Sequence, residues 1–200
     1  MLIGIVDSGG ANLASVQFAI QRAGFDSFLS ADQATLEKAD KLILPGVGAA
    51  SLAMNNLREK KLVDFLRSTH QPLMGICLGM QLLFEYSEEG NIDCLGLIPG
   101  KVKSIPKDDN FSIPHMGWNQ ATFVDGARLQ GELSASEQFY FVHSYYVDQP
   151  DDSLNWLRSE YGGQLFTSGI SRGNCFATQF HPEKSQEKGL QIYRNFIAVL

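Results

Sequence analysis

The first half of the chain alternates short apolar runs with segments that repeat at helical spacing. Apolar runs occupy residues 2–6, 40–44 and 72–76, and each is followed by small or turn-forming residues. Runs of this length without polar alternation are typical of strands that are buried on both faces of a parallel sheet. The pattern therefore predicts parallel strands joined by right-handed crossovers.

The segments between these runs have the periodicity of amphipathic helices. Asn12 is predicted to cap the first helix, and Gly24 is predicted to end it. A second helical region follows residue 48, and a last helix is predicted over residues 186–199. The side chains expected to face the core are Leu13, Val16, Ile20, Leu52, Leu57, Leu62, Phe65, Leu66, Leu190, Tyr193 and Ile197.

The pattern changes after about residue 95. Short alternating strands are predicted at residues 101–103, 138–147 and 174–180. We expect an antiparallel layer and then a return to the central sheet. The predicted fold is α/β and three-layered, with a mostly parallel central sheet flanked by helices and a smaller antiparallel layer. Because no linker or repeat interrupts the pattern, residues 1–200 are expected to form a single domain.

Composition narrows the classes of function. The 200 residues carry a formal net charge of −6 and no basic run, which argues against a nucleic-acid partner. The three cysteines form no Cys-x-x-Cys pair, so neither zinc nor a disulfide framework is expected and a reducing compartment is favoured. No apolar run reaches membrane-spanning length, and the N-terminal run is too short for a signal peptide. We therefore expect a cytoplasmic protein without a membrane partner.

Cys77 is the first candidate for chemistry. It lies in Gly75-Ile76-Cys77-Leu78-Gly79, where a predicted strand gives way to a helix. Glycines around a sharp strand-to-helix turn allow one side chain to project from the carboxyl edge of a sheet. The helix N-terminus favours thiolate over thiol, and the Leu78 N–H would point toward an oxyanion formed by attack on a carbonyl. A lone cysteine here is more often a buried apolar residue, so the functional interpretation needs a base.

A base and an acid that orients it are predicted near the C-terminus. His181 follows the largely apolar residues 176–180, and Glu183 lies two positions later, so both side chains can project together from extended backbone. Pro182 stiffens the link between them. Glu183 is placed to accept a hydrogen bond from one ring nitrogen of His181, which leaves the other nitrogen to face Cys77.

The loop Pro45-Gly46-Val47-Gly48 follows another predicted strand. Such glycines alone fit an ordinary tight turn, and the loop lacks the Lys-Ser/Thr pair of a phosphate loop. It is expected at the same sheet edge as Cys77, so Val47 or Gly48 can supply a second backbone N–H to an oxyanion. Two such donors beside a thiol are what acyl transfer requires.

These motifs together resemble the class I, or triad, glutamine amidotransferases. The resemblance rests on Gly-Ile-Cys-Leu-Gly-Met-Gln from residue 75, His-Pro-Glu-Lys-Ser from residue 181, and the Pro-Gly-Val-Gly loop. Residues 114–119 (PHMGWN) and 140–145 (YFVHSY), with the opening residues 7–13, more narrowly resemble the glutaminase subunits of imidazole glycerol phosphate synthase. The resemblance covers essentially the whole chain.

The resemblance implies a role for each matching residue. Cys77 would attack the side-chain amide carbon of L-glutamine, His181 would act as base and acid, and Glu183 would orient His181. The N–H groups of Val47 and Leu78 would hold the oxyanion. The residues implied in glutamine binding are Gly46, Gly48, Gln81, His143, Ser144 and Tyr145. No cofactor and no metal are implied, and His115 is expected only to support a turn.

A partner chain is expected because free ammonia in neutral water is mostly protonated and no longer nucleophilic. A biosynthetic glutaminase must pass it directly to an acceptor site, and the 200 residues contain no sign of a second substrate domain. The resemblance implies a heterodimer with the (β/α)₈ cyclase subunit of imidazole glycerol phosphate synthase, in histidine biosynthesis. The residues implied at that contact are Asn12, Trp118, Tyr140 and Lys184.

Three alternatives stay open. A stand-alone γ-glutamyl or small-amide hydrolase could use the same three side chains. A paralogous glutaminase could serve another amidotransferase, for example one that acts on a sugar. A non-catalytic binding subunit could retain the fold, although all three triad residues are present.

Overall fold

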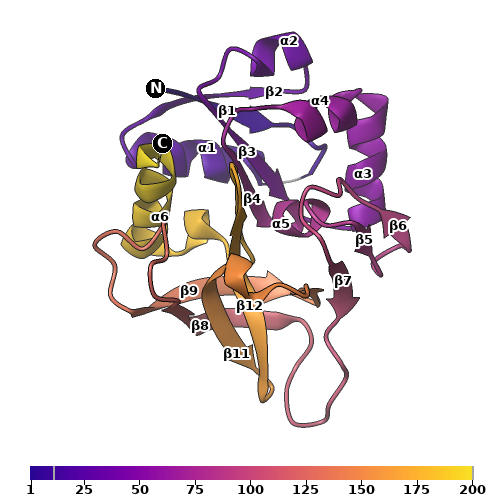
Figure 1. Ribbon diagram of the computed structural model, residues 1–200, viewed down its shortest axis with the longest axis vertical. Coiled ribbons are helices and arrows are strands. Elements are labelled where there is room, and N and C mark those ends of the chain that lie inside the picture. The colour runs from indigo at the N-terminus through magenta and orange to yellow at the C-terminus, as the bar shows by residue number, and fades with distance from the viewer. Residues whose placement is uncertain (11, 200) are drawn as a thin grey trace.

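A nine-stranded sheet forms the centre of the computed structural model, which describes residues 1–10 and 12–199 (Figure 1). Ala11, which belongs to the opening motif, and Leu200 lie outside the described residues. The strand order is β2-β1-β3-β4-β13-β12-β11-β8-β9. The strands are β1 (Leu2–Val6), β2 (Asp26–Ser30), β3 (Lys41–Gly46), β4 (Leu73–Cys77), β8 (His115–Phe123), β9 (Ser136–His143), β11 (Asn155–Tyr161), β12 (Gln164–Arg172) and β13 (Cys175–Thr178).

The strand pairing in this sheet changes from parallel to antiparallel at β13. Pairs from β2 to β13 are parallel, and pairs from β13 to β9 are antiparallel. A smaller four-stranded sheet has the order β10-β7-β5-β6. Its strands are β5 (Tyr86–Ser87), β6 (Ile92–Asp93), β7 (Lys101–Ser104) and β10 (Tyr145–Asp148). The α/β class is confirmed, but the strand predicted over 138–147 is two strands, β9 and β10, which belong to different sheets because the chain bends at Ser144.

Helices cover both faces of the parallel half of the sheet. Figure 1 shows α1 beside α6, with α3 on the opposite side of the molecule. The helices are α1 (Leu13–Arg22), α2 (Gln33–Leu36), α3 (Ala50–Glu59), α4 (Leu62–Ser68), α5 (Leu78–Leu82) and α6 (Gln186–Ala198), with 3-10 turns η1 (Asp152–Leu154) and η2 (Pro182–Lys184). None of the helices within the described ranges combines the length and apolar character needed to cross a bilayer.

The strand pattern divides the core into two apolar clusters. Ile43 packs into the cluster that contains α1 and α6, whereas Leu42 and Leu44 pack into the cluster that contains α3, α4 and α5. Successive side chains of a strand point to opposite faces of the sheet, so one apolar run contributes side chains to both clusters. This explains why the run from residue 40 to residue 44 carries no polar alternation after its first two residues.

The prediction that Leu52 faces the core is wrong. Leu52 is 59% exposed, whereas α3 buries Ala50, Ala53, Met54 and Leu57 at helical spacing. Leu52 lies five residues before Leu57, which is about 140° around a helix, so the two side chains face different ways. The other side chains predicted to face the core from α3 and α4 are buried: Leu57, Leu62, Phe65 and Leu66.

Candidate active site

Cys77 lies at a strained turn between β4 and α5. Its backbone angles are φ 52° and ψ −108°, a left-handed region that residues with a side chain seldom occupy. β4 runs between β3 and β13, so the turn projects from the carboxyl edge of the parallel strands between these two neighbours. The structure therefore has the sharp turn that the glycines predict, and the thiol is buried with 6% of the residue exposed.

Two glycines make this turn sterically feasible. A Cβ atom on Gly79 would lie 1.8 Å from the Leu44 carbonyl oxygen, and one on Gly75 would lie 2.7 Å from the Gly79 carbonyl oxygen. Both obstacles are backbone atoms, so no side-chain rotation relieves them. The absence of side chains allows α5 to begin directly against β3, which brings Leu78 against Gly46 at the end of that strand.

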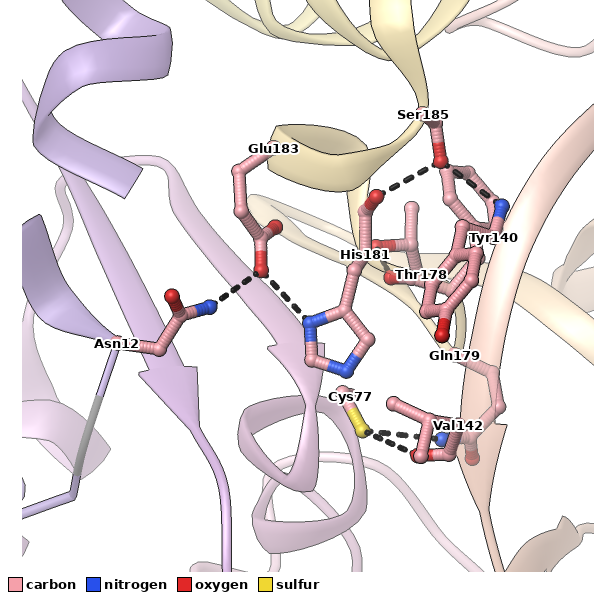
Figure 2. Close-up of polar contacts among 10 residues, drawn as sticks. Asn12, Cys77, Tyr140, Val142, Thr178, Gln179, His181, Glu183 and Ser185 are labelled. Carbon is pink, nitrogen blue, oxygen red and sulfur yellow. Dashed lines mark hydrogen bonds and ion pairs between the residues drawn. The ribbon is translucent and has the colours of Figure 1, made fainter. Parts of the chain in front are cut away.

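His181 and Glu183 form a buried pair next to Cys77 (Figure 2). The His181 Nδ1 atom lies 2.7 Å from Glu183 Oε1. The same carboxylate oxygen accepts a hydrogen bond of 3.0 Å from Asn12 Nδ2. The predicted contact exists, but the backbone between the two residues is the 3-10 turn η2 instead of the extended chain that we expected, because Pro182 begins a helical turn.

The backbone of His181 is anchored to β9. The His181 N–H donates to the Tyr140 carbonyl oxygen over 2.9 Å. Ser185 Oγ donates to the His181 carbonyl oxygen over 2.7 Å and accepts from the Tyr140 N–H over 3.0 Å (Figure 2). These bonds fix the base relative to a strand that also lines the site.

The surroundings of His181 favour its charged form. Burial opposes the charge, but the Cys77 sulfur and the Glu183 carboxylate together raise the pKa of His181 above its ordinary value. The Nε2 atom is buried, makes no ordinary hydrogen bond within the described part of the chain, and faces Cys77 in Figure 2. Because Nδ1 is committed to Glu183, Nε2 is the nitrogen that can exchange a proton with the sulfur.

Cys77 opens onto a cavity of about 300 Å³. This volume suits a small ligand such as an amino acid. The lining residues are Val47, Gly48, Cys77, Leu78, Gln81, Glu89, Pro114, Val142, His143, Ser144, Tyr145 and His181. Of the residues predicted to bind glutamine, Gly46 alone is missing from this lining, because α5 packs on it: a Cβ atom there would lie 2.9 Å from Leu78 Cβ.

A chain of hydrogen bonds holds His143 on the far wall of the cavity. Its Nδ1 atom lies 2.8 Å from the Tyr145 carbonyl oxygen, and its Nε2 atom lies 2.9 Å from His115 Nδ1. The next contact, 3.2 Å, joins His115 Nε2 to Asn119 Nδ2. Burial lowers the pKa of His115 to about 4 and that of His143 to about 3, so both rings are neutral at pH 7. His115 therefore supports the cavity wall rather than a turn.

Glu89 is a lining residue that sequence reasoning missed. It lies between β5 and β6, and its Oε2 atom accepts a hydrogen bond of 2.8 Å from the Ala50 N–H at the start of α3. Burial raises the pKa of its carboxyl group. The local sequence, Ser87-Glu88-Glu89-Gly90, reads as an ordinary polar turn, so no signal marks Glu89 before the fold brings it to the cavity.

Three of the four residues predicted at a partner contact gather in one place. Trp118 is 49% exposed, and its ring centroid lies 6.1 Å from that of Tyr140. Lys184 Nζ lies 5.7 Å from the centroid of the same Tyr140 ring. Asn12 instead contacts Glu183, and its side chain makes no cap bond to α1. Asn12 therefore occupies the predicted N-cap position of α1, but its side chain makes no cap hydrogen bond there.

A thiol, a buried imidazole and a carboxylate at the edge of a mixed α/β sheet define a triad hydrolase site. The family described as glutamine amidotransferase class-I matches residues 5–200. The chain belongs to the class I glutamine amidotransferase family.

Similar proteins cover nearly the full chain. This chain is 47% identical over 195 residues to the imidazole glycerol phosphate synthase subunit HisH of Xanthomonas axonopodis pv. citri. The aligned residues cover 98% of this chain and 96% of that protein. Identity to the Haemophilus influenzae protein of the same description is 45%, with the same shares covered. A crystal structure of a glutamine amidotransferase superposes with a TM-score of 0.76 at 18% identity over 98% of this chain and 96% of that one, which supports the fold alone.

Gly79→Ala is expected to lower the free energy of unfolding by about 3 kcal/mol or more, because the new Cβ atom overlaps a backbone oxygen. Urea denaturation measures the loss. Gly163→Ala is the matched control: a Cβ atom there meets open space, and only the left-handed backbone costs about 1 kcal/mol. Equal stability of the two variants would contradict the steric account of the turn.

Acidification from pH 7 to pH 5 is expected to destabilise the fold through His115 and His143. In the unfolded chain their pKa returns to about 6.5, so unfolding takes up protons and stability falls as the pH falls. The loss begins near pH 6.5, ends near pH 4 for His115 and pH 3 for His143, and reaches about 2 kcal/mol per ring at pH 5.

Urea unfolding at both pH values measures this loss. His143→Gln is expected to show a smaller difference between pH 7 and pH 5 than the parent protein, whereas His70→Gln, at an exposed position, leaves the difference unchanged. The same pH difference in the parent protein and in His143→Gln would refute the assignment of neutral rings.

Proposed function

We propose that this chain is the glutaminase subunit of an imidazole glycerol phosphate synthase. It hydrolyses L-glutamine to L-glutamate and ammonia, and it passes the ammonia to a cyclase subunit for histidine biosynthesis. The observation that carries the proposal is the joint presence of Cys77, His181 and Glu183 around one cavity in a chain 47% identical to a protein described as a subunit of that synthase.

The first half of the reaction forms a thioester. His181 Nε2 takes the thiol proton, the Cys77 sulfur bonds to the amide carbon of glutamine, and the carbonyl electron pair moves onto oxygen. Backbone N–H groups of Leu78 and Val47, both in the cavity lining, hold this oxyanion. The intermediate collapses when His181 gives its proton to the nitrogen, the C–N bond breaks, and ammonia leaves a γ-glutamyl thioester on Cys77.

The second half regenerates the thiol. Neutral His181 takes a proton from water, whose oxygen attacks the thioester carbon. The tetrahedral intermediate then expels sulfur, which recovers its proton from His181, and L-glutamate leaves. Glu183 stays ionised and keeps the imidazole oriented through the 2.7 Å contact to Nδ1.

Glutamine is held by the wall opposite the triad. The Glu89 carboxylate offers a negative charge to the α-ammonium group of the substrate. Gly48, Gln81 and the segment 143–145 enclose the rest of the amino-acid moiety. A cavity of about 300 Å³ matches the size of an amino acid, which favours glutamine over extended γ-glutamyl compounds.

The partner contact is proposed at the exposed aromatic cluster of Trp118 and Tyr140 beside Lys184. Met116, 61% exposed on the same strand β8, extends this apolar surface. Aromatic and methionine side chains are enriched where proteins associate. Tyr140 is bonded through its backbone to His181, so the cluster lies directly behind the base. We place the protein in the cytoplasm, in keeping with its three free cysteines.

Cys77→Ala is expected to lower ammonia release from glutamine by at least about 10³-fold, because the covalent route is lost. Ammonia is measured with and without a cyclase subunit and its nucleotide ligand, and complex formation is followed by size exclusion. The variant should still bind the cyclase. Cys175→Ala, a buried thiol outside the cavity, is the control and should retain turnover.

Unchanged turnover in Cys77→Ala would refute the mechanism. Turnover of another γ-glutamyl compound, without turnover of glutamine, would favour a stand-alone hydrolase. Absence of a complex at micromolar concentrations would remove the proposed partner.

Glu89→Gln is expected to raise KM for glutamine about tenfold with a smaller change in kcat, because a charge that binds the substrate is lost while the acceptor for the Ala50 N–H remains. Steady-state ammonia release measures both constants. Glu88→Gln, an exposed neighbour, is the control. A KM equal to that of the parent protein would exclude Glu89 from substrate binding.

A further inference from the structure

Gln179 is a fully buried amide beside the reacting thiol, and the triad mechanism gives it no task. It follows β13, lies two residues before His181, and is 0% exposed. Its backbone N–H donates to the Ser168 carbonyl oxygen over 2.9 Å. Its side-chain Nε2 lies 3.7 Å from Cys77 Sγ, within hydrogen-bonding distance for sulfur (Figure 2). A buried polar side chain at the nucleophile calls for a physical reason.

A second glutamine determines which end of this amide faces the sulfur. Gln81 Nε2 donates to the Tyr145 carbonyl oxygen over 3.0 Å and to Gln179 Oε1 over 3.1 Å. A carbonyl oxygen only accepts, so the Gln81 NH₂ group must point toward Tyr145. Its second hydrogen then requires an oxygen from Gln179. A rotated Gln179 amide would set two NH₂ groups against each other, so the Gln179 NH₂ group is the end that faces Cys77.

The Cys77 sulfur therefore has two polar neighbours of opposite character. The Val142 carbonyl oxygen lies 3.7 Å from Sγ and accepts from the protonated thiol (Figure 2). The Gln179 N–H donates instead, so it bonds best to the sulfur after the proton has left. A hydrogen bond to the charged form of a group favours that form.

We propose that Gln179 is a positioning residue that holds Cys77 ready for attack by donating a hydrogen bond to its thiolate. Gln81 keeps the donor aimed at the sulfur, and the Tyr145 carbonyl oxygen keeps Gln81 in place. The cavity wall at Tyr145 and the nucleophile are thereby joined through two amides. The inference rests on the proposed role of Cys77 as nucleophile, but its test needs no glutamine.

Four titratable side chains share the cavity around Cys77 and bear on any pH profile. His181 faces the sulfur directly, and His143 lies on the β9 wall. Glu89 lies on the wall between β5 and β6, and Tyr145 lies at the start of β10. Glu183 acts on the sulfur through His181. Gln179→Met removes the amide without adding or removing a titratable group, so a change in its profile is assigned to the amide.

The test is the rate at which iodoacetamide alkylates Cys77 between pH 5 and pH 10. Peptide mass spectrometry counts the adduct on Cys77 separately from Cys94 and Cys175. In Gln179→Met, which keeps the shape but removes the donor, the rate at pH 7 is expected to fall about tenfold and the midpoint of the profile to rise by about one pH unit. Gln138→Met, the same change at an exposed position, should match the parent protein.

A second variant covers the case in which Gln179→Met does not fold. Gln179→Glu keeps an oxygen for Gln81 and replaces the donor with an acidic oxygen, so the midpoint should move in the same direction. Parent-like alkylation in whichever of these variants folds would overturn the inference. If the Gln179 variants alkylate more slowly than the parent protein, but the parent protein releases no ammonia from glutamine, the inference is kept and the proposed function is rejected. The two failures are therefore distinguishable.

Discussion

The close contact between α5 and β3 is the constraint on which the site depends. Gly79 lies so near the Leu44 carbonyl oxygen that no side chain fits between them. This proximity forces the chain to leave β4 through a residue with a positive φ angle, and that residue is Cys77. The backbone strain at Cys77 is thus a consequence of packing, and it places the thiol at the sheet edge where the other groups converge.

The charged groups at this edge are arranged so that burial does not leave a charge alone. An isolated buried charge is costly, but a hydrogen-bonded pair with defined geometry is not. Glu183 is held by both His181 and Asn12, and His181 faces Cys77. A proton can therefore move between sulfur and imidazole without creating an unpaired charge. The neutral ring of His143, on the opposite wall, adds no competing charge to the same cavity.

Local sequence was sufficient for the parts of the site that adjoin strand ends. The glycines around Cys77 and the short spacing from His181 to Glu183 allow few backbone conformations. Both motifs could therefore be predicted from the sequence without the fold. The strand from residue 40 to residue 44, which is buried on both faces, could also be predicted, because its apolar residues are consecutive.

Contacts between residues far apart in the sequence could not be predicted. Glu89 lies in an ordinary polar turn, and Gln179 lies inside a strand-end motif where only the meeting with Gln81 gives its amide a direction. Both depend on tertiary placement, which one-dimensional periodicity does not encode. The error at Leu52 is of another kind, because its spacing of five residues from Leu57 already places it on a different face of α3.

Covalent capture of Cys77 tests the central claim most directly. The protein is incubated with a diazoketone analogue of L-glutamine, and the modified peptide is identified by mass spectrometry. A reactive thiol beside a glutamine cavity predicts one adduct per chain, located on Cys77 and prevented by an excess of L-glutamine. Modification of Cys94 or Cys175 instead, or labelling of Cys77 that L-glutamine does not slow, would contradict the account.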